Sequence, residues 1–215
     1  MSTFVILVIA SYLMGNINPA TIIARLNGID IKNAGSGNPG TTNVMRTMGM
    51  KLAVVTLIVD ILKGSIPVLA GFYISSDYIK STDIASILNA TGMQGNQHAF
   101  VAGACMLAAV IGHIFPVFHG FKGGKGIATS IGAVYVLDFR MGLLYIVAIL
   151  LPAMITRKMS VGSIFAACCL PIMFYFYRRE IWVLALILAV IMIIKHIGNI
   201  KRLIKGEEPN MLNIR

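Results

Sequence analysis

The sequence predicts an all-α, polytopic membrane protein with about seven transmembrane helices. Hydrophobic residues make up 57% of the 215-residue chain and charged residues only 12%, whereas soluble domains carry roughly 25% charged residues. The mean hydropathy is +0.83. The apolar residues form blocks of roughly twenty residues, enough to cross a hydrocarbon core about 30 Å thick. The length favours a single membrane-embedded domain, 1–215.

The predicted helices follow these apolar blocks in order, at residues 3–24, 51–74, 98–115, 127–137, 141–156, 161–177 and 181–195. Glycine, asparagine and proline interrupt the first helix at 15–19. Polar or glycine-rich connections at 25–50, 75–97 and 116–126 separate the next ones. The third and fourth segments are short or contain glycine, so they are expected to be tilted or partly re-entrant. A count of five or six spans stays open.

The lysines and arginines predict the orientation, because cytoplasmic loops of membrane proteins are enriched in them. An outside N-terminus and a cytoplasmic C-terminus place most of them inside, with only Lys80, Arg140, Arg178 and Arg179 outside. The cytoplasmic set is Arg25, Lys32, Arg46, Lys51, Lys122, Lys125, Arg157, Lys158, Lys195, Lys201, Arg202, Lys205 and Arg215. The net charge of +10 is spread over segment ends, so it indicates membrane contact and no nucleic-acid partner.

The first motif, GSGNPGTTNVMR at 35–46, combines three glycines, five hydrogen-bonding side chains and one arginine. Glycine leaves backbone N–H groups open to a close ligand, and arginine supplies a fixed cation. A plain connecting loop is the alternative. Beside a membrane, the pattern favours an anion site. Its polar side chains and cation are Ser36, Asn38, Thr41, Thr42, Asn43 and Arg46.

The second motif, GHIFPVFHGFKGGKGIATS at 112–130, surrounds Lys125 with glycines just before a predicted helix. A helix N-terminus and a lysine both attract anions. The motif departs from a nucleotide-binding P-loop, because Lys125 stands where the second glycine of the P-loop belongs and Gly126 replaces the hydroxyl residue that follows its lysine. It therefore predicts phosphate binding without nucleotide hydrolysis, and a positively charged turn is the alternative. The residues concerned are Lys122, Gly123, Gly124, Lys125 and Gly126.

The third motif is KHIGNIKRLIKGEEP at 195–209. His196 and Asn199 share a face if the last helix continues through them. A polar pair at the mouth of a helical bundle is a functional candidate. The following cations, Lys201, Arg202 and Lys205, are typical of a basic tail at the membrane interface. Ser160 and Ser163 give a weaker signal, because serine also caps helices.

Asp60 and Lys63 are three residues apart in the second helix, so they are predicted to pair within the membrane. No His, Cys or Glu cluster has zinc spacing, and no nucleophile elbow or Ser-His-Asp set is evident. No metal or other cofactor is expected. Cations, hydroxyls and glycines at one membrane face suit a reaction between a phosphate-bearing substrate and a lipid-like one.

Together, the order and spacing of the three motifs resemble those of the bacterial acyl-phosphate-dependent glycerol-3-phosphate acyltransferases, over essentially the whole chain. The resemblance implies transfer of a fatty acyl group from acyl phosphate to position 1 of glycerol 3-phosphate, releasing lysophosphatidic acid and inorganic phosphate. It also implies a multi-pass protein of the bacterial cytoplasmic membrane, with its active site facing the cytoplasm. Transient contact with the enzyme that makes acyl phosphate is compatible with this role.

The resemblance also implies residue roles. Ser36, Arg46, Lys125 and Asn199 would hold glycerol 3-phosphate or the two phosphates. His196 would orient or deprotonate the attacking hydroxyl, unless a substrate phosphate takes the proton. The acyl-phosphate site would be lined by Asn38, Thr41, Thr42, Asn43, Gly124, Gly126, Ser160 and Ser163.

An organic-phosphate transporter is the alternative function, since it would also need cations near a helix N-terminus. Apart from Asp60 and Lys63, however, few polar residues are predicted to cross the bilayer, whereas transporter sites usually lie near its midplane. A non-catalytic subunit that binds anionic lipids would explain the basic segment ends but not the glycine motifs.

Overall fold

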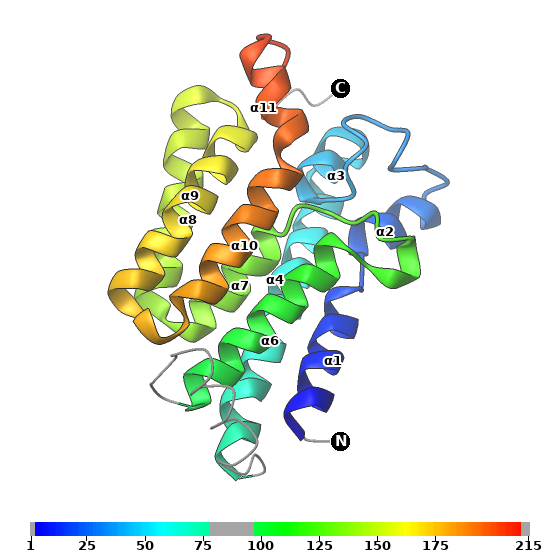
Figure 1. The fold of residues 1–215 in the computed structure, drawn as a ribbon. Helices are drawn as coiled ribbons and strands as arrows, with labels where there is room; N and C mark the ends of the chain where they lie inside the picture. Colours follow the sequence, from blue (N-terminus) through cyan, green and yellow to red (C-terminus); the bar gives the residue numbers. More distant parts are fainter. Residues whose placement is uncertain (1–2, 78–96, 212–215) are drawn as a thin grey trace.

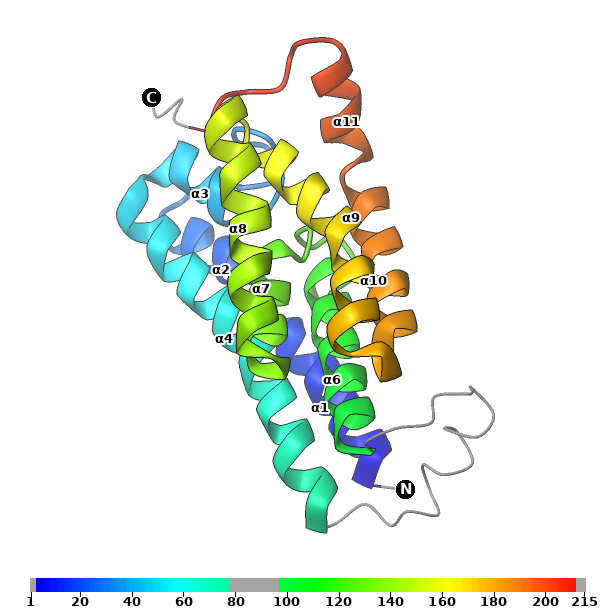
Figure 2. The ribbon, with the colours of Figure 1, turned by 90° about the vertical axis from the view of Figure 1, so that its left-hand side faces the viewer.

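The computed structural model describes residues 3–77 and 97–211, and all regular secondary structure in them is helical (Figure 1). This agrees with the predicted all-α class. Most of the predicted connection at 75–97 lies outside the described residues. Figure 2 shows the long helices running side by side along the bundle.

The first predicted segment is two helices, α1 (Thr3–Gly15) and α2 (Pro19–Leu26), which are separated at the predicted interruption. Asn18 caps α2, because its Oδ1 accepts a hydrogen bond from the backbone N of Thr21 at 2.9 Å. Proline at the first helical position has no N–H that would lack a partner there. The chain therefore turns at a defined place.

The second half of the first motif is a helix, α3 (Thr41–Met48), where the sequence predicted a loop. Val44 and Met45 of α3 are buried and pack with Ala20 and Ala24 of α2 in a small second core. The motif thus begins as a loop and ends as a helix that carries Arg46.

The other predicted helical ranges all overlap helices of the structure. These elements, with two short 3-10 turns (η), are α4 (Met50–Asp77), α6 (Gln97–Ile114), η1 (Val117–His119), α7 (Ile127–Leu137), α8 (Phe139–Thr156), α9 (Met159–Tyr177), η2 (Arg179–Ile181), α10 (Trp182–Lys195) and α11 (Ile197–Ile204). His196 and Asn199 do not share one continuous helix. The chain bends by 52° between α10 and α11, with His196 at the bend.

Five helical segments in the described part of the chain are long and apolar enough to cross a membrane, and α10 with α11 is a sixth if the bent pair counts as one span. The 11 residues of α7 span only about 16 Å along the helix axis, too little to cross alone. Seven crossings therefore remain a prediction. Figure 1 places the start of α1 and the end of α11 at opposite ends of the bundle.

Glycines bring α4 and α7 into close backbone contact. A methyl group added at Gly64 would lie 2.0 Å from the carbonyl oxygen of Thr129, and one added at Gly132 would lie 2.1 Å from that of Ile61. Small residues at helix crossings are common in membranes, where packing drives helix association. The contact fixes the start of α7 against α4.

Large apolar side chains cover the outside of the bundle, as expected for lipid contact. On α4 they include Val54, Ile58 and Leu62, each 45–50% exposed.

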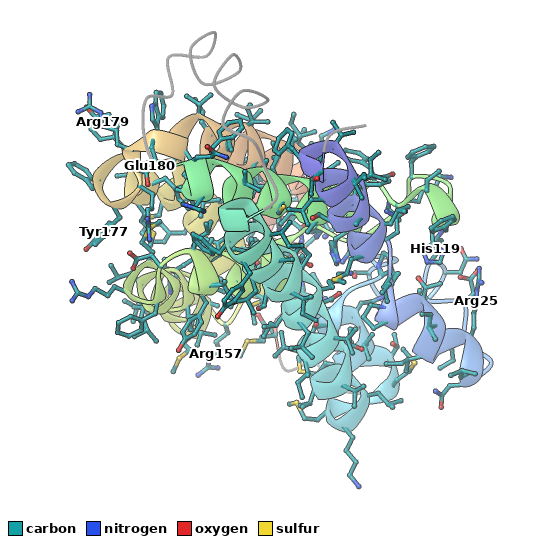
Figure 3. The ribbon with its side chains drawn as sticks, turned by 90° about the horizontal axis from the view of Figure 1, so that it is seen from below. Arg25, His119, Arg157, Tyr177, Arg179 and Glu180 are labelled. Atoms are coloured by element: carbon teal, nitrogen blue, oxygen red, sulfur yellow. The ribbon has the colours of Figure 1, made fainter. Side chains whose placement is uncertain are left out.

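Viewed along the bundle, Arg25 and His119 lie near each other at one edge, and Arg179 and Glu180 lie at the opposite edge (Figure 3).

Candidate functional site

A cavity of about 360 Å³ lies between α3, α4, α7, α8, α9 and the bend before α11. It brings together residues of all three sequence motifs, although these lie far apart in the chain. The predicted site residues that line it are Ser36, Thr41, Thr42, Arg46, Lys125, Gly126, Ser160, Ser163, His196 and Asn199.

Three helices start at this cavity: α3, α7 and α9. Thr41, Ile127 and Met159 are their first residues, and all three line the cavity. None of the three N-termini is capped by a side-chain hydrogen bond. Backbone N–H groups at a helix start have no partner within the helix, and the helix dipole is positive there. The arrangement therefore favours an anion in the cavity.

A chain of polar contacts joins the second and third motifs. The Lys125 ammonium donates to the Oδ1 of Asn199. The Nδ2 of Asn199 donates to one oxygen of Glu208 at 2.7 Å, and Arg202 donates to the other oxygen at 2.7 Å. Both oxygens of the buried Glu208 carboxylate are thus occupied, and the amide of Asn199 is held in one orientation.

Arg46 links α3 to the segment that follows α11. One terminal nitrogen donates to the carbonyl oxygens of Pro209 and Asn210, at 3.3 and 3.2 Å. Its Nε is buried and has no hydrogen-bond partner within residues 3–77 and 97–211. The hydroxyls of Thr41 and Ser160, which also line the cavity, are likewise buried without a hydrogen-bond partner in the described part of the chain. Such unpaired buried groups are costly unless a ligand or water binds them.

The pKa values of the cationic groups in the cavity reflect their burial and the charges of their neighbours. Burial lowers the pKa of the Lys125 ammonium to about 8. The carboxylate of Glu208 opposes this shift, whereas Arg202 and Arg46 reinforce it. Burial also lowers the pKa of the Arg46 guanidinium, again against the pull of Glu208. An anion bound here would stabilise both cations.

Glu208 stays ionised despite its burial. Burial alone would raise the pKa of its carboxyl group, but hydrogen bonding and the charge of Arg202 bring it below its ordinary value. Asn199 and Arg202 are the hydrogen-bond donors at 2.7 Å. The Ser160 hydroxyl also acts on this pKa, although its oxygen makes no hydrogen bond within 3.5 Å.

His196 is buried at the bend between α10 and α11 and lines the cavity. Its Nδ1 lies 2.7 Å from the carbonyl oxygen of Met192. A carbonyl oxygen can only accept, so Nδ1 carries the proton in this hydrogen bond. The neutral ring therefore keeps a free lone pair on Nε2.

Five predicted residues do not line the cavity: Asn38, Asn43, Lys122, Gly123 and Gly124. Lys122 is exposed on the loop before α7. Asn43 is buried and shapes the first motif instead. Its Oδ1 accepts from the backbone N of Ser36 at 2.8 Å, and its Nδ2 donates to the carbonyl oxygen of Ala34 at 2.9 Å.

The glycines of the second motif differ from the expectation that their N–H groups are open to an anion. The N–H of Gly123 donates to the carbonyl oxygen of Ile114 at 3.2 Å, and that of Gly124 donates to His113 at 3.1 Å. These carbonyls stand at the end of α6, where no intrahelical partner is available. The glycines thus hold the loop against α6 and leave Lys125 beside the cavity.

Sequence reasoning missed three residues that line the cavity. Glu208 lies in a charged tail that reads as solvent-exposed, so nothing local marks its burial. Asp60 forms its predicted ion pair with Lys63, at 2.8 Å, and also reaches the cavity. His113 lies 3.4 Å from the same oxygen of Asp60. The only hint of its role in the sequence is that His113 lies within the second motif, at 112–130.

The rest of the cavity lining is largely apolar. It is formed by Leu57, Ile61, Ile127, Ile131, Ile146, Ile149, Leu150 and Met159. Leu150 is also 45% exposed on the outer surface, so the cavity wall reaches the lipid-facing side of α8. The site therefore combines a cationic end with an apolar end.

The chain matches the family model of glycerol-3-phosphate acyltransferase over residues 5–206. It is 38% identical over 210 residues to the glycerol-3-phosphate acyltransferase of Thioalkalivibrio sulfidiphilus, which covers 96% of this chain and 93% of that protein. It is 41% identical over 208 residues to the enzyme of that name from Francisella tularensis subsp. holarctica, covering 95% of this chain and 91% of that protein.

Solved structures give the same relationship. The crystal structure of PlsY, an integral membrane glycerol 3-phosphate acyltransferase, in its glycerol 3-phosphate form superposes with a TM-score of 0.82 and 33% identity, covering 97% of this chain and 96% of that one. The lysophosphatidic acid form of PlsY gives a TM-score of 0.79 at 33% identity, with 97% and 95% covered.

Proposed function

This chain belongs to the glycerol-3-phosphate acyltransferase family, and we propose that it transfers a fatty acyl group from acyl phosphate to position 1 of glycerol 3-phosphate. The products are lysophosphatidic acid and inorganic phosphate, in the first step of phospholipid synthesis. The observation that supports this most is the joint presence, in one cavity, of three uncapped helix starts, two cations and an apolar wall.

In this proposal the cationic end binds the phosphates. Arg46 and Lys125 supply fixed charge, and the first turns of α3, α7 and α9 supply N–H donors. Two phosphoanionic substrates must share the site, so one cation would leave a net repulsion between them. Ser36 and Asn199 complete the binding set, and Glu208 fixes the Asn199 amide.

The apolar end accepts the acyl chain. Ile131 lines the cavity about one helical turn beyond the start of α7, and Ile146 lines it from the middle of α8. Leu150 belongs to both the cavity wall and the outer surface, so the acyl chain can enter sideways from the bilayer. Burying an apolar chain here contributes binding energy in proportion to the area removed from water.

The donor explains why no covalent nucleophile is needed. Acyl phosphate is a mixed anhydride, so the hydroxyl oxygen of glycerol 3-phosphate attacks the acyl carbon directly. The bond from that carbon to the phosphate oxygen then breaks, and phosphate leaves with the electron pair. Ser163 donates to the carbonyl oxygen of Met159 in its own helix, and the hydroxyl of Ser160 has no hydrogen-bond partner among the described residues, so neither of these cavity serines is paired with a histidine there. Positioning and charge stabilisation supply the acceleration.

The hydroxyl proton has two candidate acceptors. His196 offers a free Nε2 lone pair, because its Nδ1 is engaged by Met192. A phosphate oxygen of a substrate is the other acceptor.

The active site faces the cytoplasm in the orientation favoured by the lysines and arginines. We further propose that the protein lies in the bacterial cytoplasmic membrane, within reach of the enzyme that supplies acyl phosphate.

The test uses detergent-purified protein, labelled glycerol 3-phosphate, and either palmitoyl phosphate or palmitoyl-CoA. We expect lysophosphatidic acid from palmitoyl phosphate alone. Product from the CoA thioester would keep the acyltransferase and overturn the donor. No product from either donor in folded protein, together with glycerol 3-phosphate uptake by proteoliposomes, would favour the organic-phosphate transporter.

A further inference from the structure

Two buried charged residues of α4 and a histidine of α6 form a connected group beside the loop that carries Lys125. The Nζ of Lys63 lies 2.8 Å from Asp60 Oδ1 and donates to the carbonyl oxygen of Ile17 at 2.6 Å. His113 Nδ1 lies 3.4 Å from the same Asp60 oxygen. Asp60, Lys63 and His113 are each at most 4% exposed.

Such a group is costly in a membrane span, because charges removed from water must be compensated. A purely structural crossing of two helices could be made with apolar residues, as the glycine contacts between α4 and α7 show. Asp60 and His113 also line the substrate cavity. Their position therefore points to a role in the site.

The imidazole of His113 stands directly against Gly124. A Cβ added at Gly124 would lie 2.1 Å from His113 Nε2 and 2.8 Å from its Cε1. The N–H of Gly124 is bonded to the carbonyl oxygen of His113 itself. The ring and the backbone of one residue thus fix Gly124 from two directions, and the next residue is Lys125.

We propose that Asp60 and His113 are positioning residues that hold Gly124 in place and thereby aim the Lys125 ammonium into the cavity. Asp60 Oδ1 faces the Nδ1 side of the ring at 3.4 Å, a contact that does not reach hydrogen-bond geometry among the described residues. The Nε2 side of the ring limits how close the backbone of Gly124 can come. Lys63 compensates the charge of Asp60 and ties it to the break between α1 and α2. The role of Lys125 as a phosphate ligand rests on the proposed function.

The geometry provides a test by size complementation. Gly124→Ala places a methyl group against the imidazole, so it should displace Lys125 and raise the KM for glycerol 3-phosphate at least about tenfold. His113→Asn keeps a donor near Asp60, at the place of Nδ1, but removes the Nε2 edge. In that background Gly124→Ala should raise KM less than about threefold.

Gly123→Ala is the matched control. Its methyl group would lie 2.0 Å from the carbonyl oxygen of His113 and 2.6 Å from Pro116 Cδ. These atoms remain in His113→Asn, so the substitution should be equally harmful in both backgrounds. Asp60→Asn is the second variant, and it should raise KM with little change in kcat. It should also lower the thermal melting temperature, because it leaves the buried Lys63 ammonium without its compensating charge.

All variants are compared as purified protein with palmitoyl phosphate and glycerol 3-phosphate. The positioning role is supported if His113→Asn reduces the rise in KM caused by Gly124→Ala but not the rise caused by Gly123→Ala. An equal effect of Gly124→Ala in both backgrounds overturns it, as does an Asp60→Asn protein that loses melting temperature at unchanged KM. A wild-type protein without acyltransferase activity would instead contradict the proposed function.

Discussion

The Lys125 ammonium donates to the Asn199 side-chain oxygen across 74 residues of sequence. This contact joins the loop before α7 to α11, and Glu208 fixes the other half of the same amide. A lysine in the second motif is thereby oriented by the third motif. The cationic end of the cavity is a single unit whose parts are expected to depend on one another.

Removing either cavity cation should abolish most activity. We expect Arg46→Ala and Lys125→Ala to lower kcat/KM by at least about 100-fold, because each removes fixed charge where phosphate binds. Lys205→Ala is the control, since Lys205 is exposed beyond α11, and it should stay within about twofold. Comparable losses in all three variants would refute the assignment of the phosphate end.

Activity should depend on the ionisation of Lys125. Burial lowers the pKa of this ammonium to about 8, so the free enzyme loses the charge as pH rises through that value. A bound phosphate dianion stabilises the charged form, which means that binding takes up a proton above this pH. A phosphate monoester has its second pKa near about 6, so the substrate itself does not titrate there.

The affinity for glycerol 3-phosphate should therefore change little near pH 7 and fall as the pH rises through about 8. Lys125→Arg keeps its charge at these pH values, so the pH profile of its affinity should lack this fall. The measurement is KM between about pH 7 and pH 9.5. An identical decline in the arginine variant would assign the titration to another group.

Glu208 should contribute more to stability and activity than its neighbour Glu207. Glu208→Ala leaves Asn199 and Arg202 without their acceptor, at a cost of about 1–3 kcal/mol in the free energy of unfolding, and should lower activity at least about tenfold. Glu207 is exposed, so Glu207→Ala should change neither property. Thermal melting and kcat/KM would measure both effects. Equal behaviour of the two variants would show that Glu208 does not organise the site.

The deep apolar wall should set the acyl-chain preference. Ile146→Trp narrows the cavity. We expect it to raise kcat/KM for a ten-carbon acyl phosphate, relative to kcat/KM for palmitoyl phosphate, by at least about tenfold. Val147 is 54% exposed on the outer face of the same helix, so Val147→Trp should leave the ratio unchanged. A shift of equal size in the control would place the acyl chain elsewhere.

Apolar length and turn residues were sufficient to predict the long helices and the break at Pro19. The helix α3 was missed because its eight residues, Thr41–Met48, include five polar or charged side chains and form no apolar block. Its burial against α2 and α4 is a tertiary effect. The last predicted helix ends at 195, as α10 does. The bent continuation into α11 was not predicted, since the local sequence is also compatible with a straight helix across His196.

The residues of the cavity that could be predicted from the sequence are those that lie in polar motifs. Glu208 was missed because its burial depends on the chain returning over the cavity, where Met211 N donates to the carbonyl oxygen of Arg157 at 2.7 Å. The role of Gly124 was misjudged because the unpaired carbonyls at the end of α6 accept the loop N–H groups. Neither contact is visible in local sequence.

The most direct test of the account follows the reaction of purified protein by phosphorus NMR, with palmitoyl phosphate and glycerol 3-phosphate present together. We expect one inorganic phosphate for each lysophosphatidic acid formed, no phosphate release when glycerol 3-phosphate is omitted, and neither product with Lys125→Ala. Phosphate release without the acceptor, or lysophosphatidic acid formed without phosphate release, would contradict direct transfer within this cavity.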